Sequence, residues 1–124
     1  MTTYGLPPGT SIPYGSPGFP DWTYDLAAKF NLKASTYPGH QEGRAEAGFA
    51  PNPQSLNRGI DWTGSVADMQ RFAEYLLSVR KSLEQVIWEN PNTGQRVGVA
   101  GGDDVTATAY YEADMAGHRD HVHT

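Results

Sequence analysis

Glycine and proline are the residues that most restrict how this 124-residue chain can fold. The chain contains 14 glycines and 9 prolines, and such residues end helices and interrupt central strands. They crowd residues 1–20, which we expect to wrap over the surface, and residues 37–58, which we expect to form a long loop. A loop of that length in a compact domain is usually functional. The sequence therefore predicts few regular elements joined by long connections.

Hydrophobic spacing predicts two helices. The first begins near Asp21, presents Trp22, Leu26 and Phe30 at intervals of four, and ends at Asn31. The second is capped by Thr63 or Ser65 and runs to about residue 79. Its apolar stripe consists of Val66, Met69, Phe72, Ala73, Leu76 and Leu77.

Short runs rich in β-branched and aromatic residues predict strands over 32–36, 83–88, 96–100 and 105–111. Residues 90–94 predict a turn, so the runs over 83–88 and 96–100 should pair as a hairpin. Residues 101–104 are expected to end this pairing. We expect an α+β fold, in which two main helices pack on a small antiparallel sheet. The length fits one domain, spanning residues 1–124.

Charge and composition exclude several function classes. Nine Lys and Arg side chains against 14 Asp and Glu give a net charge of −5, which argues against nucleic acid as the main partner. No apolar run is long enough to span a membrane, and the first residues do not resemble a secretory signal. Because cysteine is absent, any metal must be held by histidine and carboxylate groups.

The four histidines fall in two places. His40 lies in the long loop, and His118, His121 and His123 crowd the last seven residues beside Asp120. Alternate side chains of a strand point to the same face, so His121 and His123 should project together while the valine between them packs into the core. Imidazole and carboxylate groups are typical ligands of a zinc enzyme site.

A further candidate is Asp61, which lies between Ile60 and Trp62 just ahead of the second helix. Its apolar neighbours indicate a packed strand. A carboxylate held in such a place requires a partner or a metal.

The order of these residues resembles that of the LAS group of zinc peptidases, in which a His and an Asp precede a late His-x-His or acid-x-x-His. Here they are His40, Asp61 and residues 120–123 (DHVH). Residues 57–62 (NRGIDW) resemble the Asp segment of the D-Ala-D-Ala carboxypeptidase branch. More broadly, residues 34–40, 57–64, 84–88 and 117–124 are similar to a peptidase-like module in lysins and tape-measure proteins of phages that infect mycolic-acid bacteria.

The resemblance implies a Zn²⁺-dependent hydrolase of peptidoglycan stem peptides, with its zinc site on the sheet. By this resemblance His40, Asp61 and His123 are the metal ligands, and a water molecule takes the fourth position. Asp120 and His121 both match the position of the general base, and strand alternation favours His121. His118 is a weaker candidate for stabilising an oxyanion. From the long loop, Tyr37, Arg44 and Arg58 are expected to bind a peptide carboxylate.

One spacing departs from the family pattern. His40 and Asp61 are 21 positions apart, whereas the family usually places them a few residues apart, and Gln54 stands where the carboxypeptidase branch has its His. Either a loop is inserted between the two ligands, or His40 is not a ligand and the site is degenerate. We favour the insertion, because loop closure becomes only slowly less favourable with length.

The resemblance places the action of the protein at a phage tail or at the host cell wall. A ligand one residue from the end of the chain suggests a domain cut from a longer protein, with other domains supplying wall targeting. The alternative is a non-catalytic, metal-stabilised structural module of a phage tail. A two-histidine phosphoesterase is disfavoured, because the chain lacks the two complete His-x-Thr motifs that it needs. The sequence leaves open which peptide bond is cleaved.

Overall fold

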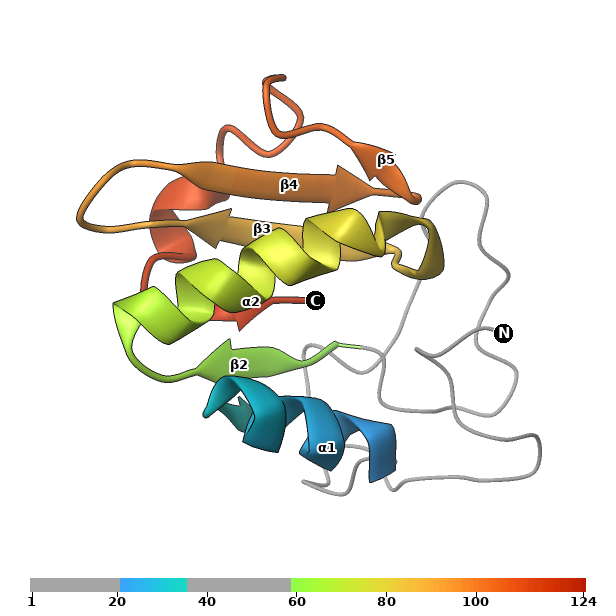
Figure 1. Ribbon diagram of the computed structural model, residues 1–124. Coiled ribbons are helices and arrows are strands. Elements are labelled where there is room, and N and C mark those ends of the chain that lie inside the picture. Colours follow the sequence, from blue (N-terminus) through green and yellow to red (C-terminus); the bar gives the residue numbers. More distant parts are fainter. Residues whose placement is uncertain (1–20, 36–58) are drawn as a thin grey trace.

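The computed structural model describes residues 21–35 and 59–124 (Figure 1). Within these residues the elements are, in chain order, α1 (Asp21–Phe30), β1 (Lys33–Ser35), β2 (Asp61–Thr63), α2 (Val66–Ser78), the 3₁₀ turn η2 (Arg80–Ser82), β3 (Gln85–Glu89), β4 (Arg96–Ala100), β5 (Asp103–Asp104), the 3₁₀ turn η3 (Met115–Gly117) and β6 (Val122–His123). The strands form one antiparallel sheet in the order β1-β2-β6-β3-β4-β5. The predicted α+β class is confirmed. The predictions for residues 1–20 and 36–58 lie outside the described residues.

Helix α2 begins where the sequence predicted. Ser65 is its N-cap, and the backbone N–H of Asp68 donates to the Ser65 hydroxyl at 3.1 Å. Four of the six residues in the predicted apolar stripe are buried, and Val66 and Leu77 lie at its half-buried margins. Figure 1 shows this helix lying across one face of the sheet.

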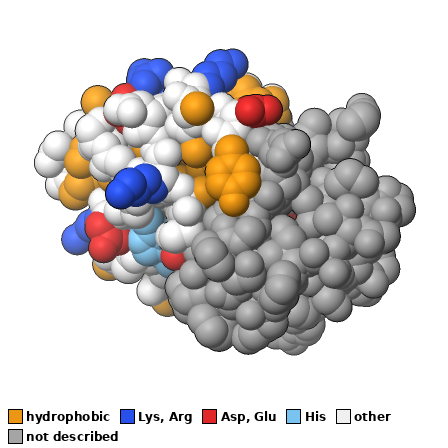
Figure 2. Space-filling model, turned by 90° about the horizontal axis from the view of Figure 1, so that it is seen from below, with side chains coloured by type: hydrophobic (Ala, Val, Ile, Leu, Met, Phe, Trp, Pro, Cys, Tyr) orange, Lys and Arg blue, Asp and Glu red, His pale blue; other side chains and the backbone are white. Residues whose placement is uncertain are grey.

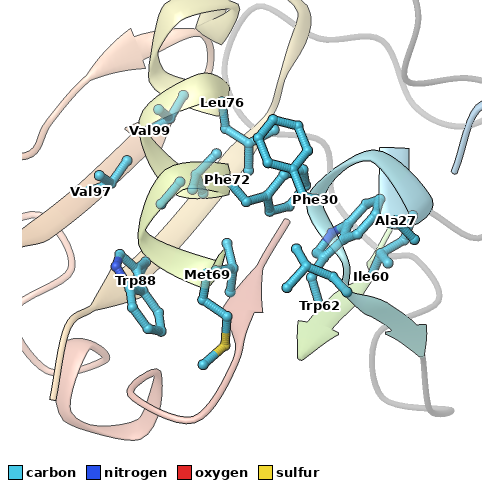
Figure 3. Close-up of a cluster of buried hydrophobic side chains, with 14 residues drawn as sticks. Ala27, Phe30, Ile60, Trp62, Met69, Phe72, Leu76, Trp88, Val97 and Val99 are labelled. Atoms are coloured by element: carbon cyan, nitrogen blue, oxygen red, sulfur yellow. The ribbon is translucent and has the colours of Figure 1, made fainter. Parts of the chain in front are cut away.

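Helix α1 also begins and ends as predicted, and Asn31 takes the left-handed conformation (φ 59°) that stops it. Its buried face is made by Thr23, Ala27 and Phe30, whereas Leu26 is only half-buried. This face packs on α2, where Phe72 lies between the rings of Phe30 and Trp62 at centroid distances of 5.2 and 4.6 Å (Figure 3). The main core therefore fills the space between the two helices and one face of the sheet.

The opposite face of the sheet has its own small apolar cluster. Ile87 on β3 and Ala100 on β4 pack there with Tyr111 and Met115 from the segment that precedes β6. Alternation in β3 places Gln85, Ile87 and Glu89 on this face and turns Val86 and Trp88 toward the main core. The second face is thus only partly apolar, and it carries polar side chains next to β6.

The strand predicted over 105–111 is wrong, because these residues form turns. Short polar side chains there bond to nearby backbone. The Thr106 N–H donates to the Asp104 carboxylate at 2.9 Å, and the Thr108 hydroxyl donates to the Val105 carbonyl at 2.7 Å. The predicted break over 101–104 also needs correction, since Asp103 and Asp104 pair with β4 as strand β5.

The hairpin of β3 and β4 is confirmed, although β3 begins two residues later than predicted and extends to Glu89. Strand β1 lies within the predicted run of residues 32–36. In residues 21–35 and 59–124, no helix combines the length and the apolar character needed to cross a bilayer.

Candidate metal and catalytic site

The predicted strand around Asp61 is confirmed as β2. Ile60 and Trp62 are buried on either side of Asp61 in the sequence, and they fix the short strand in the sheet. The Asp61 side chain itself is 13% exposed. A carboxylate this deeply placed lies beside polar partners from the last residues of the chain.

Strand β6 brings those last residues into the middle of the sheet, between β2 and β3. His123 is paired in register with Asp61 on one side and with Ile87 on the other. Beyond it, Thr124 and Ile60 exchange two backbone hydrogen bonds of 2.8 and 2.9 Å. These pairings hold the end of the chain on both sides of the candidate site.

His121 and His123 project to the same face of the sheet, as alternation predicted, and Val122 between them is fully buried in the main core. Both rings approach one carboxylate oxygen: Asp61 Oδ1 lies 3.4 Å from His123 Nδ1 and 3.5 Å from His121 Nε2. The ring of His118 lies beside them, with centroids 4.9 Å from His121 and 5.5 Å from His123. Figure 2 shows histidine side chains reaching the surface beside acidic and basic side chains.

Each of the three rings donates a hydrogen bond from one nitrogen to an oxygen atom; in His121 and His123 this is the nitrogen that does not face Asp61. His118 Nδ1 donates to the Asp114 carbonyl at 2.6 Å, and His121 Nδ1 donates to Asp120 Oδ1 at 2.7 Å. His123 Nε2 donates to Gln85 Oε1 at 2.8 Å. Metal-binding histidines are typically oriented by a carboxylate or carbonyl oxygen in this way.

These hydrogen bonds determine where the lone pairs point. In the neutral rings the unprotonated atoms are His121 Nε2 and His123 Nδ1, which are the two atoms that face Asp61 Oδ1. Two lone pairs and a carboxylate oxygen at these distances repel one another unless a proton or a cation lies near them. A proton on His123 Nδ1 would make its contact with Asp61 Oδ1 a hydrogen bond, and a bound cation would satisfy all three atoms.

The electrostatic surroundings keep His118 neutral and Asp120 charged. Burial lowers the pKa of His118, against an opposing effect of its hydrogen bond to the Asp114 carbonyl. The hydrogen bond from His121 lowers the pKa of the Asp120 carboxyl.

The donor set fits zinc in chemistry but is incomplete within the described residues. Two ligand atoms of one tetrahedral zinc ion lie about 3.3–3.4 Å apart, which matches the separation of Asp61 Oδ1 and His123 Nδ1. Among residues 21–35 and 59–124, however, no three histidine or acidic side chains form a group that could hold a metal ion. A zinc ion at this place would therefore need a third ligand, and the predicted one, His40, lies outside this part of the chain.

The structure thus brings together five of the eight predicted site residues, namely Asp61, His118, Asp120, His121 and His123. The predicted metal ligand His40 and the predicted substrate-binding residues Tyr37 and Arg58 lie outside the described residues, as does Arg44. The position of Asp120 distinguishes it from His121, the other candidate for the general base. The Asp120 carboxylate is 90% exposed and bonds to Nδ1 of the His121 ring, on the side away from Asp61.

Two features of the site were missed by the sequence analysis. Gln85 orients His123 through a hydrogen bond. Because Gln85 lies two residues before Ile87 on one strand, alternation could have placed both side chains on the same face of the sheet. An open groove of about 630 Å³ begins at Asp120 and Arg119 and is lined further by Val66, Met69 and Ala116. This groove lies between the start of α2 and η3, two segments that are far apart in the sequence.

Comparison with known proteins adds no relative: no family model matches the chain, and no curated protein or solved structure was found to match it.

Proposed function

We propose that the protein is a zinc-dependent peptidase that hydrolyses peptidoglycan stem peptides. The observation that carries this proposal is the convergence of His121 Nε2 and His123 Nδ1 on Asp61 Oδ1, with the opposite nitrogen of each ring engaged by an acceptor. The resemblance to LAS zinc peptidases, carried by the order of His40, Asp61 and residues 120–123, gives the substrate class. It also gives the site of action, at a phage tail or the host cell wall.

His40, Asp61 and His123 would hold the zinc. When bound, the ion supplies Lewis acidity that polarises an amide carbonyl and makes water nucleophilic near neutral pH. Asp61 contributes a negative charge, and the bond to Gln85 keeps the His123 lone pair directed at Asp61. The position of both residues in paired strands fixes them before substrate binds.

His121 is the better placed general base. Its Nε2 faces Asp61 Oδ1, so it can take a proton from water there and later deliver the proton to the leaving amine. Asp120 bonds to Nδ1 of the same ring, where it selects the required tautomer and stabilises the protonated imidazole. Asp120 then acts as a positioning residue.

His118 is better suited to accept a hydrogen bond than to stabilise an oxyanion. Its Nδ1–H already donates to the Asp114 carbonyl, and its lowered pKa leaves Nε2 without a proton at neutral pH. That nitrogen can accept a bond from a substrate N–H.

The test is digestion of purified peptidoglycan by the zinc-loaded protein, with mass spectrometry of the released peptides. We expect cleavage within the stem peptides that stops when a chelator removes the metal and returns when zinc is added. The masses of the fragments identify the bond. Loaded protein that binds zinc yet releases no peptide would contradict the peptidase.

A metal-stabilised structural module is the second candidate. It is favoured by the position of Asp61 and His123 on adjacent strands, because an ion held by both would cross-link β2 to the end of the chain. This module would bind zinc and gain stability from it, but it would leave peptidoglycan intact.

A further inference from the structure

A buried carboxylate away from the histidine rings ties down the segment that carries two of them. Glu89, at the end of β3, is only 5% exposed. Its Oε1 accepts a hydrogen bond from Arg96 Nε at 2.6 Å, and its Oε2 accepts one from Arg119 Nε at 2.5 Å. The pKa of Glu89 is lowered by the hydrogen bond from Arg96 and then by that from Arg119, so the group is charged at neutral pH.

The same residue also holds the backbone of that segment. The Glu89 N–H donates to the His118 carbonyl at 2.9 Å. Two successive residues, His118 and Arg119, are therefore attached to Glu89, one through the main chain and one through the side chain. Asp120 and His121 follow directly in the sequence.

This attachment matters because residues 118–121 have no helix or strand to hold them. Turn η3 ends at Gly117, and β6 begins at Val122. His118 and His121 nevertheless lie with their ring centroids 4.9 Å apart. Only the Glu89 side of its pair with Arg119 is buried, since the Arg119 side chain is 52% exposed. Such an ion pair contributes little net stability but can select one conformation of the segment.

From these contacts we infer that Glu89 is a positioning residue, which holds residues 118–121 so that His121 faces Asp61 and His118 stands beside it. The inference rests on the proposed function for its purpose and deepens it. Glu89 touches no ring of the site directly and acts through Arg119 and the His118 carbonyl. Arg96, the second side-chain partner of Glu89, also bonds to Glu112, and this contact leads away from the site.

The test compares the variants Glu89→Gln and Glu112→Gln in the full chain. The ring ¹⁵N signals of the metal-free protein report the tautomers of His118 and His121, and competition with a chromophoric chelator measures zinc affinity. In Glu89→Gln we expect averaged tautomer signals for His118 and His121, whereas zinc affinity should change little, because neither ring is a proposed zinc ligand. Glu112→Gln, which loses only the exposed partner of Arg96, should match the wild type in both.

A folded Glu89→Gln protein with wild-type ring signals would overturn the inference. If this variant does not fold, Arg119→Gln supplies the test, since it removes the hydrogen bond between Arg119 and Glu89 and leaves the pair of Glu89 and Arg96. It should show the same averaged ring signals, and wild-type ring signals in it would count against the positioning role. Absence of zinc binding from the wild type as well would contradict only the proposed function, because the ring signals test the positioning role without metal.

Discussion

Asp61 and His123 face each other across adjacent strands, with Oδ1 and Nδ1 3.4 Å apart in a part of the sheet where both side chains are nearly buried. The register of β2 and β6 sets this relationship, and buried Trp62 and Val122 form the next pair of that register. The candidate ligands are therefore held by the same packing that forms the core.

Replacing Gln85 with methionine should weaken zinc binding by about 10–100-fold. The variant keeps the shape of the side chain but removes the oxygen that accepts from His123 Nε2, so the ring is free to turn or to change tautomer. Chelator competition measures the affinity. Gln95→Met, at an exposed turn, is the matched control and should bind zinc like the wild type; equal affinities in both variants would refute the role of Gln85.

The two candidates for the base can be separated by their variants. His121→Ala should retain zinc and lose about 10²–10⁴-fold in the rate of hydrolysis, the usual contribution of a general base. Asp120→Asn should retain zinc and lose less, because the ring that moves the proton is still present. Rates are measured on soluble stem peptides. A larger loss in Asp120→Asn than in His121→Ala would identify Asp120 as the base instead.

The core prediction concerns Phe72, which is fully buried between Phe30 and Trp62. Phe72→Ala should lower the free energy of unfolding by about 3–5 kcal/mol, because it leaves a cavity at the contact of the two helices. Denaturant unfolding measures this change. Glu74→Ala, on the exposed side of the same helix, should change it by less than about 0.5 kcal/mol. Similar small effects for both would mean that α2 does not pack as described.

The Glu89 network should make stability depend on pH in a defined direction. The folded pKa of Glu89 is lowered, so its contribution is complete above the unfolded value of about 4.3 and is lost as the pH falls through the folded pKa. The difference in unfolding free energy between the wild type and Glu89→Gln should therefore be constant near neutral pH and shrink in acid. Denaturant unfolding from pH 7 to pH 3 measures it, and a difference that grows in acid would contradict the account.

Much of the scaffold could be predicted because its signals are local. The cap at Ser65, the left-handed Asn31 and the β4 partner of the hairpin depend on residues close in sequence. The strand predicted over residues 105–111 was wrong, because threonine and valine favour strands, whereas here the Asp104 carboxylate and the Thr108 hydroxyl bond to nearby backbone and stabilise turns.

The site was predictable in its residue types and only partly in its contacts. Alternation placed His121 and His123 on one face, and the apolar neighbours of Asp61 placed it in a strand. Alternation could place Gln85 on the right face of its strand, but the contacts of Gln85 and Glu89 with the last residues could not be predicted, because the insertion of β6 between β2 and β3 is a long-range pairing.

The most direct test of the central claim is the zinc content of the full chain after equilibration with zinc and removal of the unbound ion. The account predicts one zinc per chain for the wild type and for His118→Ala, and none for His123→Ala, in which a ligand facing Asp61 is lost. A wild-type protein that retains no zinc, or a His123→Ala protein that retains as much as the wild type, would contradict it.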